Sequence, residues 1–348
     1  MSSGTEKRRL SSPEDLFRQY QLPAGWAEPA TFTETVRING VQIFVAGFSS
    51  QNETGDPIFG SAASLSENPI DRAYFELLER ASVVSMLHDG QRHWDVRDER
   101  GIQTGTLRSS ELALVSPDPG QWRYARSNGV AVGQSWRDAC LRALWELAER
   151  DRILRSWYGE IDPVRIEMPC EMIPIGLEEL YSFEAYSFDE PVALREVHVV
   201  AVFGFPKDGD APLLYGFGAR DVRARAMGAA FGECLQRLGF LWGEQIPATQ
   251  PQFFPTADFH QEWFLWPLTH QHLHGWLAGE HAKIGPVLIE SRRGGSRRVF
   301  ADITPTELRS RVFVAKGIPR GELPLVFGRG HPSVASRLPD ALQVHPIA

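Results

Sequence analysis

The chain has 348 residues, 43% of them hydrophobic and 23% charged, with a formal net charge of -8 at pH 7 and a pI near 5.7. This composition predicts a globular protein with a large core, and the acidic balance excludes a general binder of nucleic acid or of anionic membranes. No apolar run has the length of a membrane span, no apolar signal-peptide stretch follows Arg9, and three cysteines cannot form a closed set of disulfides. We therefore expect a cytoplasmic protein.

The first elements predicted along the chain are strands. Residues 1–30 are predicted to be a polar N-terminal segment that is partly disordered. Residues 31–48 alternate apolar and polar side chains on either side of Asn39-Gly40, which is a strong signal for a two-residue type I′ turn. This pattern predicts a β-hairpin.

A nine-residue pattern, RAxxELxER, occurs twice, at 72–80 and at 142–150. Each copy is predicted to be helical because its apolar residues recur at helical spacing. Two glutamates in each copy are three positions apart and therefore share one helix face. They are Glu76 with Glu79 and Glu146 with Glu149. One such pair is usually a solvated helix face, but two brought together would be costly unless cations occupied the site, and carboxylate pairs are magnesium ligands near phosphates.

More strands and a third helix are predicted in the rest of the chain. The predicted elements are a strand pair at 93–104, a strand at 121–126, a proline-punctuated linker at 163–174, a hairpin of 197–205 with 213–217, a helix at 222–238, and strands at 299–303 and 311–314. Strand pairs that alternate with helices indicate an α+β fold, in which helices pack on mostly antiparallel sheets.

Familiar catalytic and cofactor motifs are absent from the sequence. It contains no GxxxxGK[ST] phosphate loop, no CxxC and no HExxH, and Gly216-Phe-Gly218 lacks the third glycine of a dinucleotide fingerprint. His270, His272 and His274 could bind a metal if the segment were extended, because alternate residues would then share a face. The aromatic residues around them favour a core or a partner surface instead.

Three segments, in chain order, resemble the YcaO family. They are Gly60-Ser-Ala-Ala-Ser-Leu-Ser66 before the first repeat copy, Asn128-Gly-Val-Ala-Val-Gly-Gln134 before the second, and Gly216-Phe-Gly218 before a helix with Glu233 and Gln236. The resemblance spans residues 55 to 330, most of the chain. It implies an α+β fold of the YcaO type at 31–330, which binds ATP and Mg2+ without a phosphate loop and activates a backbone amide of a peptide.

The resemblance assigns roles to individual residues. It implies magnesium-facing carboxylates at Glu76, Glu79, Glu146 and Glu149. It implies nucleotide contacts at Gln134, Asp138, Arg150 and Glu233, with Arg150 on a phosphate group. Arg80 ends the first repeat copy as Arg150 ends the second, and we expect it at the same site because arginine is the natural partner of phosphate.

Two positions depart from the family pattern. Ala131 stands where serine is common, and Ala229 stands where the family often has an arginine. Losing that arginine removes a charge-assisted contact to phosphate. Arg225 lies one helical turn earlier and is a candidate substitute.

The expected reaction is heterocyclisation, since residues 258–277 are similar to the corresponding segment of azoline-forming members. In it, a Cys, Ser or Thr side chain attacks the preceding carbonyl, ATP phosphorylates the resulting oxyanion, and elimination leaves a thiazoline or oxazoline. Macroamidine formation, thioamide formation and a non-catalytic ATP-binding or scaffold subunit are the alternatives. Ala131 and Ala229 favour the non-catalytic alternative, and the four glutamates disfavour it.

The general base of this reaction is expected at the chain end. Residues 331–348 resemble the tail that approaches the active site in ring-forming members, and they finish in Leu342-Gln-Val-His345-Pro-Ile-Ala348. The terminal carboxylate of Ala348 is the first candidate base, and His345 is the second. A solvated tail is the alternative.

The expected partners follow from the resemblance. The substrate is a ribosomally made precursor peptide, and the chain has no recognisable leader-binding domain of its own. We therefore expect a separate leader-binding partner similar to a ubiquitin-activating enzyme, and a flavin dehydrogenase where azolines are oxidised to azoles.

Overall fold

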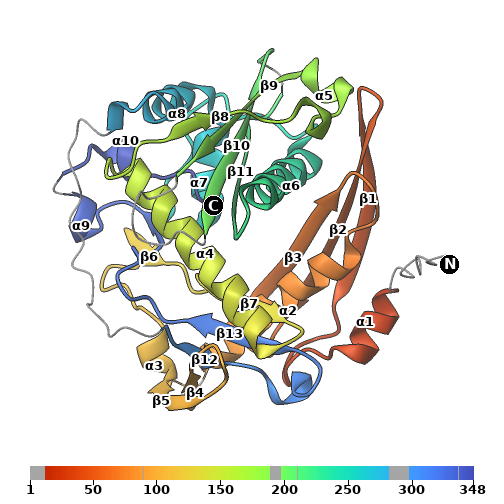
Figure 1. The fold of residues 1–348 in the computed structure, drawn as a ribbon, viewed down its shortest axis with the longest axis vertical. Helices are drawn as coiled ribbons and strands as arrows, with labels where there is room; N and C mark the ends of the chain where they lie inside the picture. Colours follow the sequence, from red (N-terminus) through yellow and green to blue (C-terminus); the bar gives the residue numbers. More distant parts are fainter. Residues whose placement is uncertain (1–11, 89, 189–196, 210, 282–297, 336) are drawn as a thin grey trace.

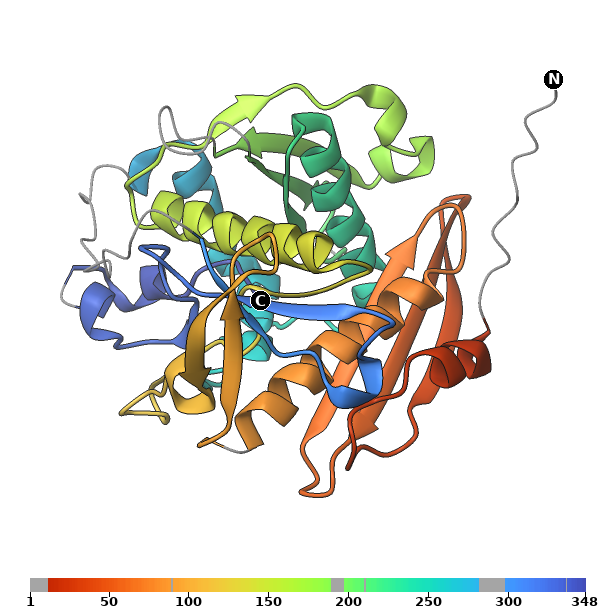
Figure 2. The same cartoon turned by 60° about the horizontal axis from the view of Figure 1, so that its bottom comes forward.

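The computed structural model describes residues 12–348 except 89, 189–196, 210, 282–297 and 336 (Figures 1 and 2). Its helices are α1 (Pro13–Gln19), α2 (Ile70–His88), α3 (Ser109–Leu112), α4 (Trp136–Trp157), α5 (Ile175–Glu178), α6 (Arg223–Leu241), α7 (Ala257–Leu265), α8 (His270–Leu277), α9 (Pro332–Ala335) and α10 (Asp340–Gln343). No helix in the described part of the chain is long and apolar enough to cross a lipid bilayer.

The strands form four antiparallel sheets, ordered β1-β2-β3, β11-β10-β9-β8, β5-β4-β12-β13-β7 and β14-β6. Their bounds are β1 (Ala30–Ile38), β2 (Val41–Gln51), β3 (Pro57–Ser64), β4 (His93–Arg97), β5 (Gln103–Arg108), β6 (Trp122–Tyr124), β7 (Val130–Gly133), β8 (Val164–Ile166), β9 (Tyr181–Ser187), β10 (His198–Pro206), β11 (Leu214–Arg220), β12 (Phe300–Asp302), β13 (Phe313–Gly317) and β14 (Val326–Gly328). The predicted α+β class, with helices on antiparallel sheets, is therefore confirmed.

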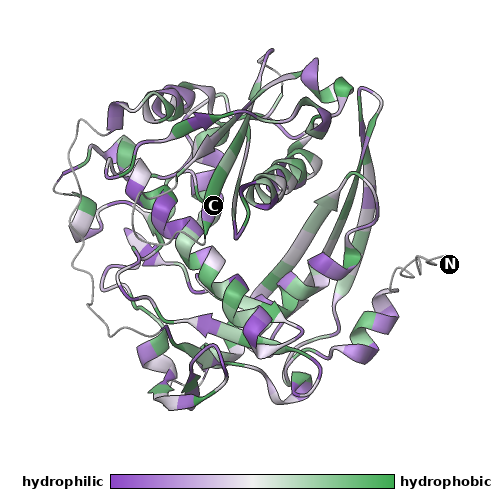
Figure 3. Ribbon diagram, in the orientation of Figure 1, coloured by the Kyte–Doolittle hydropathy of each residue, from purple (hydrophilic) through white to green (hydrophobic). Residues whose placement is uncertain are grey.

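Helices α2, α4 and α6 alternate with strands β3, β7 and β11 in a closed ring. Helix α2 contacts β3 and β7, α4 contacts β7 and β11, and α6 contacts β11 and β3. Figure 1 shows α6 between the β1-β2-β3 sheet and the β10-β11 hairpin. All three helices carry both apolar and polar residues (Figure 3), so each can pack on a strand and still offer polar side chains to the interior of the ring.

Glycines let the strands of this ring lie directly against helix backbones. A Cβ on Gly60 of β3 would come within 2.3 Å of the Ala73 carbonyl oxygen in α2, and one on Gly216 of β11 within 2.2 Å of the Ala230 oxygen in α6. A side chain at either position would push its helix away from the strand. These glycines belong to the segments that carry the family resemblance, and close packing explains their place there.

The start of the chain folds as the turn chemistry predicts. Asn39 and Gly40 have φ angles of 45° and 78°, as a type I′ turn requires, and they connect β1 to β2.

Helix α4 begins after Ser135, whose Oγ accepts the Asp138 N–H at 3.2 Å. Within the N-terminal segment 1–30, residues 1–11 lie outside the described residues, while α1 buries Leu16 against the core around α2.

Most predicted elements are present, but several strands and helices are additional. The sequence patterns did not predict β3, β8, β9, α7 or α8. The three histidines at 270–274 lie in helix α8, so they do not share one face as an extended segment would, and His274 stacks on Phe205. A metal site at these histidines would need an extended segment, and that expectation is wrong.

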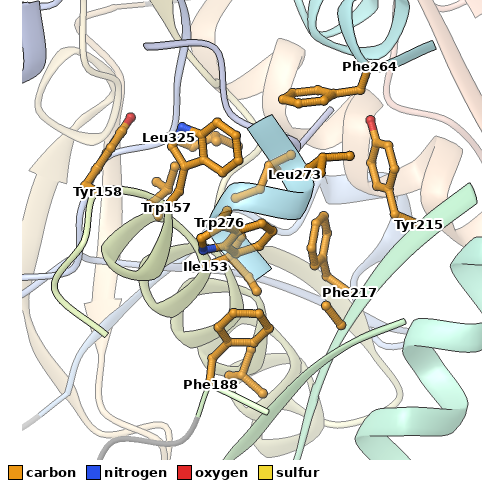
Figure 4. Close-up of a cluster of buried hydrophobic side chains, with 14 of the residues drawn as sticks. Ile153, Trp157, Tyr158, Phe188, Tyr215, Phe217, Phe264, Leu273, Trp276 and Leu325 are labelled. Atoms are coloured by element: carbon orange, nitrogen blue, oxygen red, sulfur yellow. The ribbon is translucent and has the colours of Figure 1, made fainter. Parts of the chain in front are cut away.

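The largest core joins the C-terminal half of α4 to α7, α8 and the chain end. Trp157 packs edge-on against both Trp276 and Phe264, as Figure 4 shows. Val344 and Ile347 are fully buried in the same core. The C-terminus therefore lies in the middle of the molecule, in agreement with Figures 1 and 2.

Candidate functional site

Helix α2 holds its two glutamates against two different strands. The Glu76 carboxylate accepts the backbone N–H of Ser61 in β3 at 2.8 Å. The Glu79 carboxylate accepts the N–H of Val132 in β7, also at 2.8 Å. Their spacing of three residues thus lets one helix face bridge neighbouring strands.

Helices α4 and α6 repeat this arrangement around the ring. The backbone at Gly129 and Val130, where β7 begins, lowers the pKa of Glu146 of α4, and the backbone at Ala219 of β11 lowers that of Glu149, so both carboxyl groups face these strands. In α6, Glu233 accepts the Phe217 N–H of β11 at 2.8 Å. Gln236 donates to the Ser61 backbone oxygen of β3 at 3.1 Å, which closes the ring.

The ring brings the predicted glutamates into mutual electrostatic contact. Glu79 is affected by the charges of Glu76 and Glu146, Glu149 by that of Glu146, and Glu233 by those of Glu149 and Glu76. Five carboxylates from three helices therefore influence one another's charge around this ring.

Burial and mutual repulsion disfavour the charged forms of these glutamates. Burial, followed by the neighbouring carboxylates, raises the pKa of Glu79 to about 8 despite its bond to Val132. Burial and Glu149 raise the pKa of Glu233 to about 7. Burial also raises the pKa values of Glu146 and Glu149. Perturbed groups concentrated in this way mark a candidate functional site.

Cations approach the carboxylates from several elements. Arg150 is mostly buried, with 16% of its side chain exposed, which opposes its charge, but Glu149, Glu233 and Glu146 raise its pKa. Its Nη1 lies 3.5 Å from Glu149 Oε1, while its buried Nε has no hydrogen-bond partner. Arg80 pairs with Glu76 at 2.6 Å, and 46% of its side chain is exposed at the edge of the site.

The donor set suits a hard divalent cation. Magnesium prefers oxygen ligands and commonly combines a few carboxylates with the oxygens of a substrate phosphate. The ring offers only carboxylates and amide oxygens, and a bound cation would relieve the repulsion among them. Across the described residues, no three His, Cys, Asp or Glu side chains form a ready group for one metal ion. The reason is that backbone amides hold the carboxylates against separate strands.

The predicted nucleotide contacts Gln134 and Asp138 lie where β7 runs into α4. Asp138 accepts the Gln134 backbone N–H at 3.3 Å and the Arg142 Nε at 3.0 Å. Arg142 also lowers the pKa of Glu79 by its charge, so it links this corner to the ring. The Gln134 side chain is exposed and free to meet a ligand at the edge of the ring.

The two tail candidates have different environments. His345 is fully buried, and its Nε2 lies 2.8 Å from the Val326 oxygen. Burial lowers its pKa to about 4, and the Arg150 charge contributes, so the tail comes near the phosphate-binding candidate. Ala348 is exposed. This geometry favours the Ala348 carboxylate over the His345 imidazole as a group that can meet a substrate.

Sequence reasoning missed two cations of this site. Arg220 ends β11 and lies 5.1 Å over the Trp145 ring, and the charges of Glu149 and Glu233 raise its pKa against the effect of burial. The suggested substitute Arg225 is instead 70% exposed and faces Asp221. Lys316 is buried beside Glu146, and burial lowers its pKa to about 8. A lysine in the otherwise apolar strand Phe313–Gly317 was the available signal for Lys316.

Comparison with known proteins gives one family. A sequence model described as YcaO cyclodehydratase, ATP- and Mg2+-binding, matches residues 45–282. None of the curated proteins matches the chain.

Three solved structures illustrate the likeness in fold. YcaO from Methanopyrus kandleri, bound with AMPPCP and Mg2+, aligns with a TM-score of 0.58 and 17% identity over 88% of both chains. A chain of the E. coli microcin synthetase McbBCD complex with pro-MccB17 bound aligns at 0.56 and 13% identity, over 92% of this chain and 97% of that one. A heterocyclase in complex with substrate and cofactor aligns at 0.54 and 16% identity, over 92% of this chain and 53% of that one.

Proposed function

This chain belongs to the YcaO family, and we propose that it is an ATP-dependent cyclodehydratase that forms thiazoline or oxazoline rings in a ribosomally made precursor peptide. ATP and Mg2+ are its cofactors. In the proposed reaction, a Cys, Ser or Thr side chain closes on the preceding amide carbon. The amide oxygen leaves as inorganic phosphate, so each ring costs the peptide one water and converts one ATP to ADP.

One observation carries this proposal. Three helices from distant parts of the chain each place an E-x-x-E or E-x-x-Q face on the same ring of strands. The five carboxylates of this ring repel one another, and Arg150 lies among them with an unpartnered Nε. A site of this kind is stabilised by cations together with a polyanionic ligand.

Within this site, Glu76, Glu79, Glu146 and Glu149 would hold Mg2+, and Arg150 and Glu233 would face the nucleotide. When bound, Mg·ATP supplies the phosphoryl group and neutralises its charge. Gln134, Asp138 and Arg80 would bound the nucleotide at the edge of the ring. These residues act by positioning and charge compensation, because phosphoryl transfer needs little covalent help from a protein.

The tail would supply the proton acceptor. We assign the proton of the attacking side chain, or of the amide nitrogen, to the Ala348 carboxylate at the end of segment 331–348. The exposure of Ala348 supports this, as does the buried path of the tail towards Arg150. A base must come within hydrogen-bond reach of its proton, so the position of the chain end decides its efficiency.

The proposed partners are a precursor peptide, a leader-binding protein and, where azoles are made, a flavin dehydrogenase. The similar fold in McbBCD, solved with pro-MccB17 bound, supports a peptide substrate and a multi-protein complex. The alternative products are a macroamidine or a thioamide, and the alternative to catalysis is a scaffold subunit.

The experiment combines purified protein, leader-binding partner, precursor peptide, Mg2+ and ATP. We expect phosphate release to match the loss of one water per ring. A precursor labelled with ¹⁸O in its backbone amides should transfer that label to phosphate, and replacing its Cys, Ser and Thr by Ala should stop the reaction. Turnover that persists in the Ala-substituted peptide would favour amidine formation. Peptide unchanged despite ATP binding would favour the scaffold function.

A further inference from the structure

A buried histidine joins the C-terminal tail to the rest of the fold. His260 of α7 has no exposed surface. Its Nδ1 lies 2.9 Å from the His345 backbone oxygen, and its Nε2 lies 2.9 Å from the Gly328 backbone nitrogen. The Gly328 N–H can only donate, so Nε2 accepts, and the ring proton is on Nδ1, where it donates to His345.

The His345 side chain makes a second connection to the same strand. Its Nε2 lies 2.8 Å from the Val326 oxygen, which only accepts, so this nitrogen carries the proton. Val326 and Gly328 both belong to β14, and the two imidazole rings lie 4.4 Å apart. The His345 residue is thus held between α7 and β14 through both its backbone and its side chain.

This arrangement needs the His260 imidazole to be neutral, because its Nε2 accepts the Gly328 N–H. Burial lowers the pKa of His260 well below its usual value, and the charges of His345 and Arg329 act in the same direction. Protonation of His260 would point a second N–H at the Gly328 N–H, and two donors cannot bond to each other. The two hydrogen bonds of His260 therefore depend on one specific tautomer.

We propose that His260 is the positioning residue of the C-terminal carboxylate, which rests on the proposed function of Ala348 as the base. Ala348 is three residues beyond His345, so holding the His345 carbonyl confines Ala348 to within about 10 Å of it. Pro346 has a fixed φ, and Ile347 is fully buried, which restricts the end further. His260 touches neither peptide nor nucleotide and acts through the tail.

A different tail contact serves as a matched control. Trp157 Nε1 donates to the Leu342 oxygen at 2.7 Å, three residues before His345. Trp157→Phe removes this hydrogen bond but keeps an aromatic ring in the core. If loss of any tail hydrogen bond released the chain end, Trp157→Phe and His260→Leu would have equal effects.

The test compares His260→Leu, His260→Gln and Trp157→Phe. His260→Leu removes both hydrogen bonds, whereas the Gln amide can accept from Gly328 and donate to His345. We expect carboxypeptidase to remove the last residues of His260→Leu at least tenfold faster than those of wild type, followed by intact mass. His260→Gln should restore most of the protection. In the complete system, His260→Leu should lower kcat for ring formation and leave the KM for ATP unchanged.

If carboxypeptidase released the tail of a folded His260→Leu protein no faster than that of wild type, the proposal would be overturned. It would also be overturned if Trp157→Phe released the tail as fast as His260→Leu. If the variant does not fold, long-range ¹H–¹⁵N spectra of the wild type decide the matter. We expect the proton on Nδ1 of His260 and on Nε2 of His345, and the reverse tautomers would overturn the proposal. Both readouts work without ATP, so a failure of the cyclodehydratase function would be seen separately, as an absence of ring formation in wild type.

Discussion

The ring of glutamates and the pair of His260 with His345 in the tail both bury ionisable side chains, yet their chemistry is opposite. In the ring, carboxylates from α2, α4 and α6 repel one another, and burial raises their pKa values. Around α7, His260 is neutral and both of its nitrogens have backbone partners. Crowded carboxyl groups with raised pKa values are typical of a functional site, whereas a neutral side chain with backbone partners is typical of a structural anchor.

The difference also appears in how the two regions use the backbone. Strand amides hold each carboxylate of the ring apart from the next, so the oxygens remain available to a shared ligand. Around the tail, both nitrogens of His260 and the Nε2 of His345 have backbone partners in β14 or at residue 345, whereas His345 Nδ1 is buried without one. We expect substitutions in the ring to abolish chemistry without unfolding, and substitutions at the anchor to act through position.

The largest effect is expected from the ring itself. Glu149→Gln, or Glu79→Gln, should abolish peptide modification, a loss of at least about 100-fold, because it removes a magnesium ligand. The unfolding free energy should not fall, since repulsion among the carboxylates is relieved. Ring formation is measured by mass spectrometry and stability by denaturant unfolding, with the exposed Glu244→Gln as control. Full turnover in either ring variant would contradict the metal role.

The next effect concerns the chain end. Adding a few residues after Ala348, or deleting the last three, should slow cyclisation by roughly 100-fold, in the range of general base catalysis. ATP binding should stay close to that of wild type, because the ring is untouched. Comparing single-turnover ring formation with nucleotide affinity separates the two effects. A C-terminally extended protein with wild-type turnover would show that the carboxylate is not the base.

A smaller effect is expected from the cation that sequence reasoning missed. Arg220→Gln should weaken ATP binding by about tenfold, the worth of one charge-assisted hydrogen bond. Arg225→Gln is the matched control, because Arg225 lies in the first turn of α6, five residues after Arg220, but pairs with exposed Asp221. Fluorescent nucleotide titrations measure both. If Arg225→Gln weakened binding more than Arg220→Gln, the original substitute would be the right one.

The last prediction concerns the pH dependence of stability rather than activity. Glu79 has a folded pKa of about 8 against an ordinary value of 4.5, so the native state binds more protons than the unfolded chain between these values. The unfolding free energy should therefore fall as pH rises from 5 to 8, by at most about 1.4 kcal/mol per pH unit for this group. The slope should be shallower in Glu79→Gln and in the presence of Mg·ATP. A slope of the opposite sign would contradict the crowding of the ring.

The sequence repeats and the turn residues were sufficient to predict several elements of the fold. The duplicated RAxxELxER pattern and Asn39-Gly40 predicted two helices and a hairpin, because local spacing determines both. Gln236, on the third helix of the ring, could be placed only by the resemblance to the YcaO family. Its hydrogen bond to Ser61 joins residues 175 positions apart.

Long-range contacts explain what the sequence could not provide. Nothing near Arg220 in the sequence indicates that Trp145 and Glu149 lie beside it, since α4 reaches β11 only through the tertiary fold. His260 likewise stands in an ordinary apolar helix, and its partner His345 is 85 residues away. A lone histidine of this kind has no periodic signal.

We propose that the carboxylate ring binds ATP through Mg2+. Calorimetric titration of a non-hydrolysable ATP analogue into the wild-type protein, with Mg2+ and then with EDTA, tests it most directly. We expect saturable binding with Mg2+, and at least tenfold weaker binding both without Mg2+ and in Glu149→Gln. Equal affinity in all three titrations would contradict the account.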